Sequence, residues 1–346
     1  MKTLRVIALF VVIAIGQITF VAASGEMNEF AARISNLEET VKQFEAKSSR
    51  QLNELEWFQR LSDLAVVDKV YFTGPAPEKP GVAEAMGSRD VLVPALTFLP
   101  RNVSARKKLP LLVIAHGGIH GNAASEELHI VRELIVQGYA VIAPDYRGSS
   151  GYGSAFWRMI DYGGLEIEDV HAARNYMLDR HPRLDRKRVG IIGWSHGGAI
   201  ALMTACAHPT DYQAVYAGVP VSDLAERIRI LGAGYEQNFA APYHIGKTVA
   251  EAPEEYRRRS AINHVGKLTA PLLLHANTND PDVQFPEIQR LISALNDAGK
   301  KFERHIYTNA PGGHYFNRLD TALALESRRE IWRFLGKHLR PPNPIR

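Results

Sequence analysis

A single serine stands between glycines in the pentapeptide GWSHG, at residues 193–197. An apolar run precedes it, and a run of small and apolar residues follows it, as in a strand that turns sharply into a helix. Such a turn lifts the serine hydroxyl above a sheet, and small flanking residues let neighbouring backbone approach. An ordinary hydroxyl in a glycine-rich loop is the alternative, but the strand–turn–helix context favours Ser195 as a nucleophile.

A nucleophilic serine needs a base, and the base needs an orienting carboxylate. On a fold of this kind the partners follow in the chain order serine, acid, histidine. The segment LLLHANTNDPDVQF ends a predicted strand with two candidate acids, Asp280 and Asp282. The segment IYTNAPGGHYF ends the last predicted strand with His314. A loop histidine among thirteen can be a plain surface residue, but His314 falls where the fold requires the base.

Acyl transfer also requires donors for the oxyanion that develops in the transition state. The segment VIAHGGIHGN places a His-Gly-Gly sequence directly after a predicted strand. We assign this oxyanion hole to the backbone N–H groups of Gly117 and His196, the second being the residue after the nucleophile. His116 and His120 lack a third ligand or an H-E-x-x-H pattern, so we expect no metal. Without a G-x-G-x-x-G pattern we also expect no nucleotide cofactor.

The elements that must position these residues alternate between strands and helices. Residues 69–73 and 90–100 read as antiparallel edge strands. Buried apolar runs of the parallel-sheet kind then alternate with helical patterns such as residues 165–179. The sequence therefore predicts an α/β domain over residues 64–346, a doubly wound and mostly parallel sheet flanked by helices, with the site at the carboxyl ends of its strands. The buried runs begin at residues 109, 139, 188, 214, 270 and 302.

The first 23 residues have the pattern of a secretory signal peptide, with Lys2 and Arg5, an apolar run, and a small-residue end at Ala23. We therefore expect a periplasmic or secreted protein with no stable membrane association after cleavage. The apolar run is long enough to span a membrane, so an uncleaved membrane anchor is the alternative. Removing these residues lowers the formal charge from +4 to +2.

Residues 24–63 are expected to form a helical arm before the domain. Apolar residues recur in it at alternating spacings of four and three, which predicts an amphipathic helix, and a second helical pattern follows a break at Ser48 and Ser49. The arm either packs on the domain or joins protomers as a short coiled coil, so a homo-oligomer is possible. The apolar residues of the first pattern are Phe30, Ile34, Leu37, Val41 and Phe44.

The composition of the 346 residues, 46% hydrophobic and 23% charged, is that of a globular protein. The small net charge and the absence of a basic block interleaved with aromatics argue against a nucleic-acid partner. Cys206 is the only cysteine, so no internal disulfide can form, and a buried hydrophobic role is expected for it.

Together these segments resemble the catalytic domain of the prolyl oligopeptidase family of serine peptidases, which is an α/β-hydrolase fold. The resemblance rests on HGG at 116–118, DYRGSSGYG at 145–153, GWSHGG at 193–198, NDPDV at 279–283 and GGHYF at 312–316. It implies that the acid is Asp280, three residues before Val283. We expect no counterpart of the β-propeller that usually precedes this domain, because the residues before the first predicted strand have helical patterns. Candidate substrate contacts are His116, Val221, Leu224, Asp282 and Val283.

The resemblance implies a serine hydrolase that cleaves peptide or acyl-amide bonds through Ser195, His314 and Asp280. The expected substrate is a small peptide or an acylated small molecule. The aliphatic residues Val221, within GVPVSD, and Leu224, directly after it, argue against proline specificity. A carboxylate at Asp282 would favour a cationic substrate group. A carboxylesterase using the same triad is the alternative. A non-catalytic binding protein on this fold is a third possibility, which the intact triad disfavours.

Overall fold

The computed structural model describes residues 2–77, 90–101, 103–104 and 106–345, with side chains from residue 28 onward. Its described part contains an eight-stranded sheet with the order β1-β2-β4-β3-β5-β6-β7-β8. The pairs β1–β2 and β2–β4 are antiparallel, and the remaining neighbours are parallel. The strands are β1 (Ala65–Gly74), β2 (Val91–Pro100), β3 (Leu109–Ala115), β4 (Ala140–Pro144), β5 (Leu184–Trp194), β6 (Ala214–Gly218), β7 (Leu272–Asn277) and β8 (Glu303–Tyr307).

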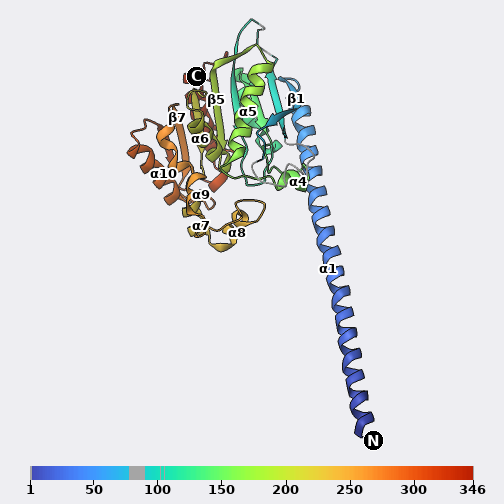
Figure 1. The fold of residues 1–346 in the computed structure, drawn as a ribbon. Helices are drawn as coiled ribbons and strands as arrows, with labels where there is room; N and C mark the ends of the chain where they lie inside the picture. Colours follow the sequence, from blue (N-terminus) through green and yellow to red (C-terminus); the bar gives the residue numbers. More distant parts are fainter. Residues whose placement is uncertain (1, 78–89, 102, 105, 346) are drawn as a thin grey trace.

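Helices cover both faces of this sheet (Figure 1). One buried cluster joins the sheet to α5, α6 and α10, and a second joins its opposite face to α3, α11 and the end of α1. Successive residues of β3 alternate between the two clusters, as a strand buried on both faces requires. The helices are α1 (Lys2–Leu61), α3 (Leu128–Gln137), α4 (Ser154–Trp157), α5 (Leu165–Arg180), α6 (His196–Ala207), α7 (Leu224–Leu231), α8 (Ala233–Ala240), α9 (Pro253–Arg258), α10 (Phe285–Asp297) and α11 (Ala322–Leu339).

The expected α/β-hydrolase architecture, with antiparallel edge strands before a parallel sheet, is confirmed. The break expected at Ser48 and Ser49 is wrong, because α1 continues through both residues as one helix. The signal-peptide prediction for residues 1–23 falls on side chains outside the described set. Among the described residues, no helix is both long and apolar enough to cross a membrane.

The last turns of α1 are part of the domain. The Trp57 side chain is only 2% exposed, lies 5.2 Å from the Phe98 ring of β2, and donates from Nε1 to the carbonyl oxygen of Ala123 at 3.0 Å. Seven residues earlier, Arg50 donates from Nε to the carbonyl oxygen of Gly151 at 2.9 Å. Burial of the Trp57 indole and these two bonds therefore fix the end of the arm against the loops above the sheet.

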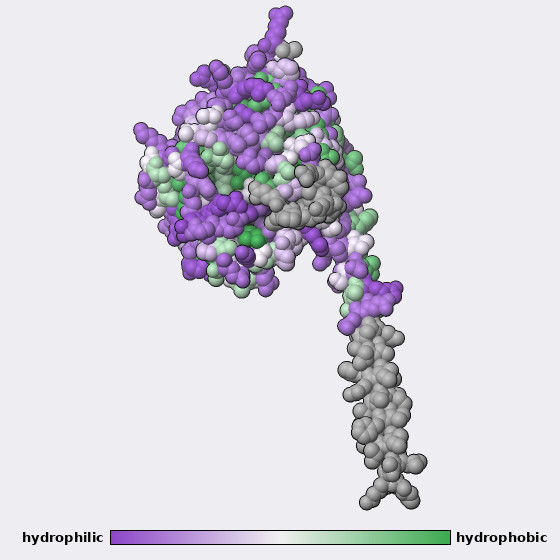
Figure 2. All heavy atoms as spheres, in the orientation of Figure 1, coloured by the Kyte–Doolittle hydropathy of each residue, from purple (hydrophilic) through white to green (hydrophobic). Residues whose placement is uncertain are grey.

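The preceding part of α1 extends away from the body of the domain (Figure 1). Its apolar stripe is between 42% and 69% exposed, and hydrophobic side chains are visible on the arm in Figure 2. The arm therefore has two parts, one packed on the domain and one exposed to solvent. The exposed residues are Phe30, Ile34, Leu37, Val41 and Phe44.

Replacing Trp57 with alanine should lower the free energy of unfolding by about 3–5 kcal/mol, because it removes a fully buried aromatic side chain. Leu55→Ala is the matched control, since Leu55 lies on the same helix but is 63% exposed; its effect should stay within roughly 0.5 kcal/mol. Urea unfolding followed by circular dichroism measures both. Equal effects of the two substitutions would contradict the docking of α1.

Candidate active site

Ser195 lies at the turn between β5 and α6 with a left-handed backbone, φ 59° and ψ −124°. Its N–H donates to the carbonyl oxygen of Gly218 at 2.9 Å, which holds the turn against the neighbouring strand β6. A Cβ on Gly193 would lie 2.2 Å from the carbonyl oxygen of Gly197, and one on Gly197 would lie 2.1 Å from that of Ala115. A side chain at either glycine would therefore clash with the backbone. The serine takes the strained conformation expected of a nucleophile elbow.

His314 and Asp280 form a buried pair on the loops after β8 and β7. The Nδ1–H of His314 donates to Oδ2 of Asp280 at 2.7 Å. The other carboxylate oxygen, Oδ1, accepts the N–H groups of Asp282 and Val283 at 2.8 and 2.9 Å. These bonds fix the carboxylate and leave Nε2 of His314 as the nitrogen that can accept a proton from a hydroxyl.

The second candidate acid, Asp282, is placed differently. Its carboxylate is 56% exposed, and its Oδ2 lies 4.0 Å from Nε2 of His314. Asp280 is buried and bonded to Nδ1 instead. The geometry of an orienting acid is therefore found at Asp280, while Asp282 is placed beside the position that a substrate would occupy.

A cavity of about 590 Å³ brings the predicted residues together. Ser195, His314 and Gly117 line it, and so does His196. Helix α1 contributes Ser49 and Asn53 to the same wall, so the end of the arm borders the candidate site. Other lining residues that the sequence analysis did not single out include Glu126, Glu127, Tyr162, Arg227, Tyr315 and Arg318.

The candidate substrate contacts divide into two groups. Val221, Asp282 and His116 line the cavity. Leu224 and Val283 are buried in the core and do not line it, so we now assign these two side chains to the packing beneath the site.

The imidazole of His116 is built into the loops around the cavity. It stacks on Tyr146 with the ring centroids 4.1 Å apart, and its Nε2 lies 2.9 Å from the Ser149 hydroxyl. Burial lowers the pKa of His116 to about 3, so the ring is neutral at physiological pH. Neutral and hydrogen-bonded, it is suited to holding the oxyanion loop in place.

The His196 side chain connects both sides of the predicted oxyanion hole. Its Nδ1 lies 2.9 Å from the carbonyl oxygen of Gly118, and its Nε2 lies 2.8 Å from Oε1 of the buried Glu166. Because a carbonyl only accepts, Nδ1 carries a proton. The ring also stacks on Tyr162 at 3.9 Å. The side chain after the nucleophile therefore anchors the loop that follows Gly117.

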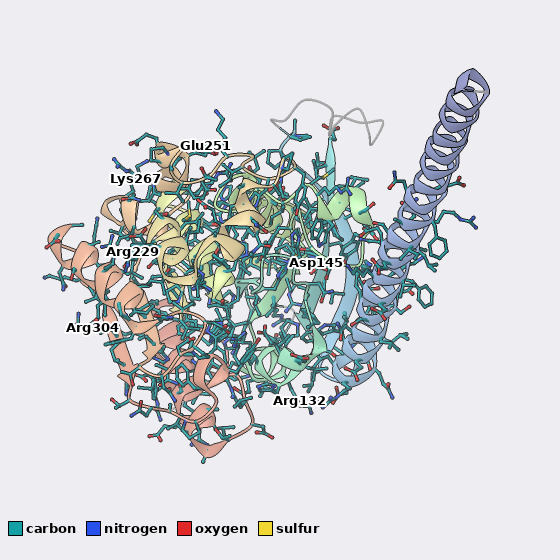
Figure 3. The ribbon with its side chains drawn as sticks, turned by 90° about the horizontal axis from the view of Figure 1, so that it is seen from below. Arg132, Asp145, Arg229, Glu251, Lys267 and Arg304 are labelled. Atoms are coloured by element: carbon teal, nitrogen blue, oxygen red, sulfur yellow. The ribbon has the colours of Figure 1, made fainter. Side chains whose placement is uncertain are left out.

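A buried carboxylate joins this loop to the segment 145–153. Asp145 accepts the hydroxyl of Tyr152 at 2.5 Å and the N–H of Ala123 at 2.6 Å. Burial raises the pKa of Asp145 to about 6. Figure 3 shows Asp145 inside the fold near α1, whereas Arg229 and Arg304 lie at the periphery. The ring of Tyr152 in turn stacks under Arg50 of α1 at 4.5 Å, so the arm and the site share one network.

Residues 127–341, which contain the elbow, the acid and the histidine, match the model of the prolyl oligopeptidase family. The chain belongs to this family. The match begins just before α3 and does not include α1, β1, β2 or β3.

Family relatives align with only part of their own length. The chain is 27% identical over 222 residues to the uncharacterized peptidase YuxL of Bacillus subtilis, covering 64% of this chain and 33% of that protein. It is 28% identical over 251 residues to human dipeptidyl peptidase 8, covering 68% of this chain and 26% of that protein. The chain thus aligns with about a third or less of these two relatives.

A solved structure of a puromycin-hydrolyzing peptidase from Mycobacterium tuberculosis shares the fold. The TM-score is 0.64 with 22% sequence identity, and the alignment covers 78% of this chain and 39% of that one. The similarity supports the α/β-hydrolase architecture described above.

We expect His196→Phe to lower kcat by about 10- to 100-fold with little change in KM, because the oxyanion loop loses its anchor while the ring can still stack on Tyr162. His196→Gln, which retains a donor, should recover part of the loss. Steady-state kinetics of both variants measure this, with thermal melts to confirm folding. Equal kcat in His196→Phe and the unchanged protein would contradict a positioning role for the side chain.

Proposed function

We propose that this chain is a serine peptidase in which Ser195 attacks the carbonyl carbon of a small peptide or acyl-amide. His314 accepts the serine proton at Nε2 and returns it to the leaving nitrogen, while Asp280 holds the imidazole in the required tautomer. The N–H groups of Gly117 and His196 stabilise the oxyanion, and water then hydrolyses the acyl-enzyme. The observation that carries the proposal is the buried bond between Asp280 and His314, in the same cavity as the strained serine.

The cavity wall favours a short substrate with a positively charged group. Ser49 and Asn53 of α1 border the cavity, on a helix fixed by Trp57, so the arm limits the space available. Asp282 and Glu126 line the same cavity with carboxylates, while its two arginines are paired, Arg318 with Glu127 and Arg227 with the buried Glu287. A cationic group, such as a free amine, would therefore be attracted more than an acidic one.

Amide hydrolysis is tested directly with a panel of aminoacyl and acyl-aminoacyl p-nitroanilides, with p-nitrophenyl butyrate alongside. We expect anilide turnover that is lost in Ser195→Ala and falls about 10⁴-fold in kcat in Asp280→Asn, because the latter removes the orienting carboxylate. Asp282→Asn is the matched control, since that carboxylate is exposed; it should keep most of kcat. Ester turnover without amide turnover would indicate a carboxylesterase. No turnover of either substrate class would indicate a non-catalytic protein.

The exposed stripe of α1 supports a further proposal, that two copies pair through their arms in parallel. Ile34 and Val41 occupy the a positions of a heptad, and Phe30, Leu37 and Phe44 occupy the d positions. β-Branched residues at a, as at Ile34 and Val41, together with leucine at d, as at Leu37, favour two parallel strands. In that arrangement Arg33, at a g position, would face Glu38 of a second copy, at an e position, with opposite charge.

The double variant Ile34→Asp/Leu37→Asp should be a monomer where the unchanged protein is a dimer, because it buries charge in the paired stripe. Asn36→Asp/Gln43→Asp adds the same charge on the outward c positions and should leave the dimer intact. Sedimentation equilibrium measures the mass of each. A monomeric unchanged protein would contradict the pairing.

The location of the protein is also a proposal. The apolar run with its basic start and small-residue end supports export to the periplasm or outside the cell. Retention of the run as a membrane anchor is the alternative, and N-terminal sequencing of the purified protein distinguishes a cleaved chain from an intact one.

A further inference from the structure

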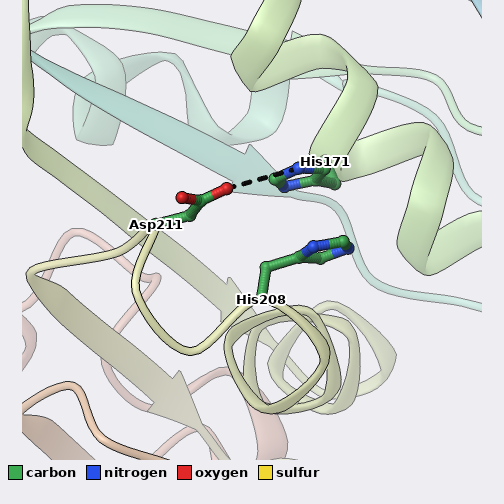
Figure 4. Close-up of side chains that lie close together, drawn as sticks. All are labelled: His171, His208 and Asp211. Carbon is green, nitrogen blue, oxygen red and sulfur yellow. Dashed lines mark ion pairs between the residues drawn. The ribbon is translucent and has the colours of Figure 1, made fainter.

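A second cluster of ligand-bearing side chains lies away from the cavity, on the outer side of α5 and α6. His171 belongs to α5, His208 follows the last residue of α6, and Asp211 lies on the turn after it. One ligand atom from each of the three lies within 4.8 Å of the others (Figure 4). The packing of α5 against the end of α6 therefore brings His171 to a pair of residues that lie close together in sequence, His208 and Asp211.

The two imidazoles face each other. Their ring centroids are 3.5 Å apart and their planes differ by 4°, and Nε2 of His171 lies 3.4 Å from Oδ2 of Asp211. Figure 4 shows the carboxylate of Asp211 directed at the His171 ring. A cation bound among these atoms would replace the face-to-face stacking of two polar rings with direct ligand bonds. Two histidine nitrogens and a carboxylate form a ligand set typical of zinc.

A fourth residue supports the cluster from α5. Glu168, one turn before His171, has its Oε2 3.0 Å from Nε2 of His208. Metal-bound histidines commonly use their second nitrogen to donate to a carboxylate, which orients the ring. Bound to Glu168 at Nε2, His208 has its Nδ1 left to act as a ligand.

The competing explanation is an ordinary ion-pair cluster, because Arg174 is close. Its Nη1 lies 3.4 Å from Oδ2 of Asp211, at the limit of a hydrogen bond. The shortest bond of the guanidinium goes to Asn175, where Nη1 donates to Oδ1 at 2.7 Å, and Nε donates to the backbone carbonyl oxygen of Asp211, not to its carboxylate. The cluster therefore contains two carboxylates, those of Glu168 and Asp211, but only one arginine. The resulting net negative charge favours binding of a cation.

The electrostatics of the His171 ring agree with this. Burial, together with the neighbouring His208 and Arg174, lowers the pKa of His171 to about 4, so its ring is neutral at physiological pH with a lone pair free to bind. Only neutral imidazole coordinates a metal.

We propose that His171, His208 and Asp211 bind a divalent transition metal such as Zn²⁺, with Glu168 orienting His208. The metal would tie the end of α6 to α5. Because α6 begins directly after Ser195 and spans 12 residues, about 18 Å of helix separates this site from the nucleophile. The site is therefore structural and takes no part in the chemistry.

The catalytic residues complicate the test, because Asp280, Asp282 and His314 also place ligand atoms within 4.8 Å of one another. The experiment therefore uses His314→Ala, which disables the second group, as the background, and adds the double variant His171→Asn/His208→Asn to that same background. Each purified protein is stripped with EDTA, dialysed, and titrated with Zn²⁺ while Tm is followed. Co²⁺ is used in parallel, since its visible absorption reports nitrogen and oxygen ligation directly.

We expect His314→Ala to keep the Co²⁺ absorption and a Zn²⁺-induced rise in Tm on the order of 5 °C at a hundredfold excess over Kd. The double variant should lose both. His305→Asn is the matched control, because His305 also pairs with a carboxylate, that of Glu330, but lies outside the cluster; it should behave as the unchanged protein. Metal effects that persist in the double variant, that vanish in His314→Ala, or that occur in no variant would overturn the proposal.

Discussion

The left-handed backbone of Ser195 is the constraint around which the site is arranged. A non-glycine residue with φ 59° and ψ −124° costs about 1–3 kcal/mol, and it persists only where its surroundings hold it. Here the N–H of Ser195 bonds to Gly218, while its carbonyl oxygen accepts the N–H groups of Ala199 and Val221. These bonds tie the turn to β6 and to the first turn of α6, and Ser195 is held in the lining of the cavity.

The end of the helical arm is held against the domain and forms part of the cavity wall. Trp57 packs on Phe98 of β2, and Arg50 holds the loop containing Gly151. Ser49 and Asn53 line the cavity. Relatives such as dipeptidyl peptidase 8 are about four times as long as the segment aligned here. In the described structure, a single helix supplies a wall of the site, so the space offered to a substrate depends on how firmly that helix is docked.

Much of the fold and the candidate triad could be predicted from the sequence. Parallel strands end at one edge of a sheet, so polar residues that follow buried runs, as Ser195, Asp280 and His314 do, converge there. The continuity of α1 could not be predicted, because serine disfavours a helix by only roughly half a kcal/mol per residue. Tertiary contacts of Arg50 and Trp57 outweigh that preference.

Residues brought together by folding alone left no local signal. Arg227 and Arg318 line the cavity from segments about 90 positions apart in the sequence. His171 and His208 stack across two helices that show only ordinary helical patterns. The role of the His196 side chain was likewise hidden, since its partner Glu166 sits 30 positions earlier, inside another helix. Leu224 and Val283 lie next to family motifs in the sequence, which led us to expect substrate contacts, but both side chains are buried in the core.

The crowding around the two outer glycines of the pentapeptide affects how inactive variants are to be read. Even a methyl group on Gly193 or Gly197 would meet carbonyl oxygens at close to 2 Å. In a random library, loss of activity at these two positions would therefore report a displaced backbone and carry no information about chemistry. Ser195 differs, because alanine fits its backbone as well as serine does, and a folded but inactive protein there isolates the hydroxyl itself.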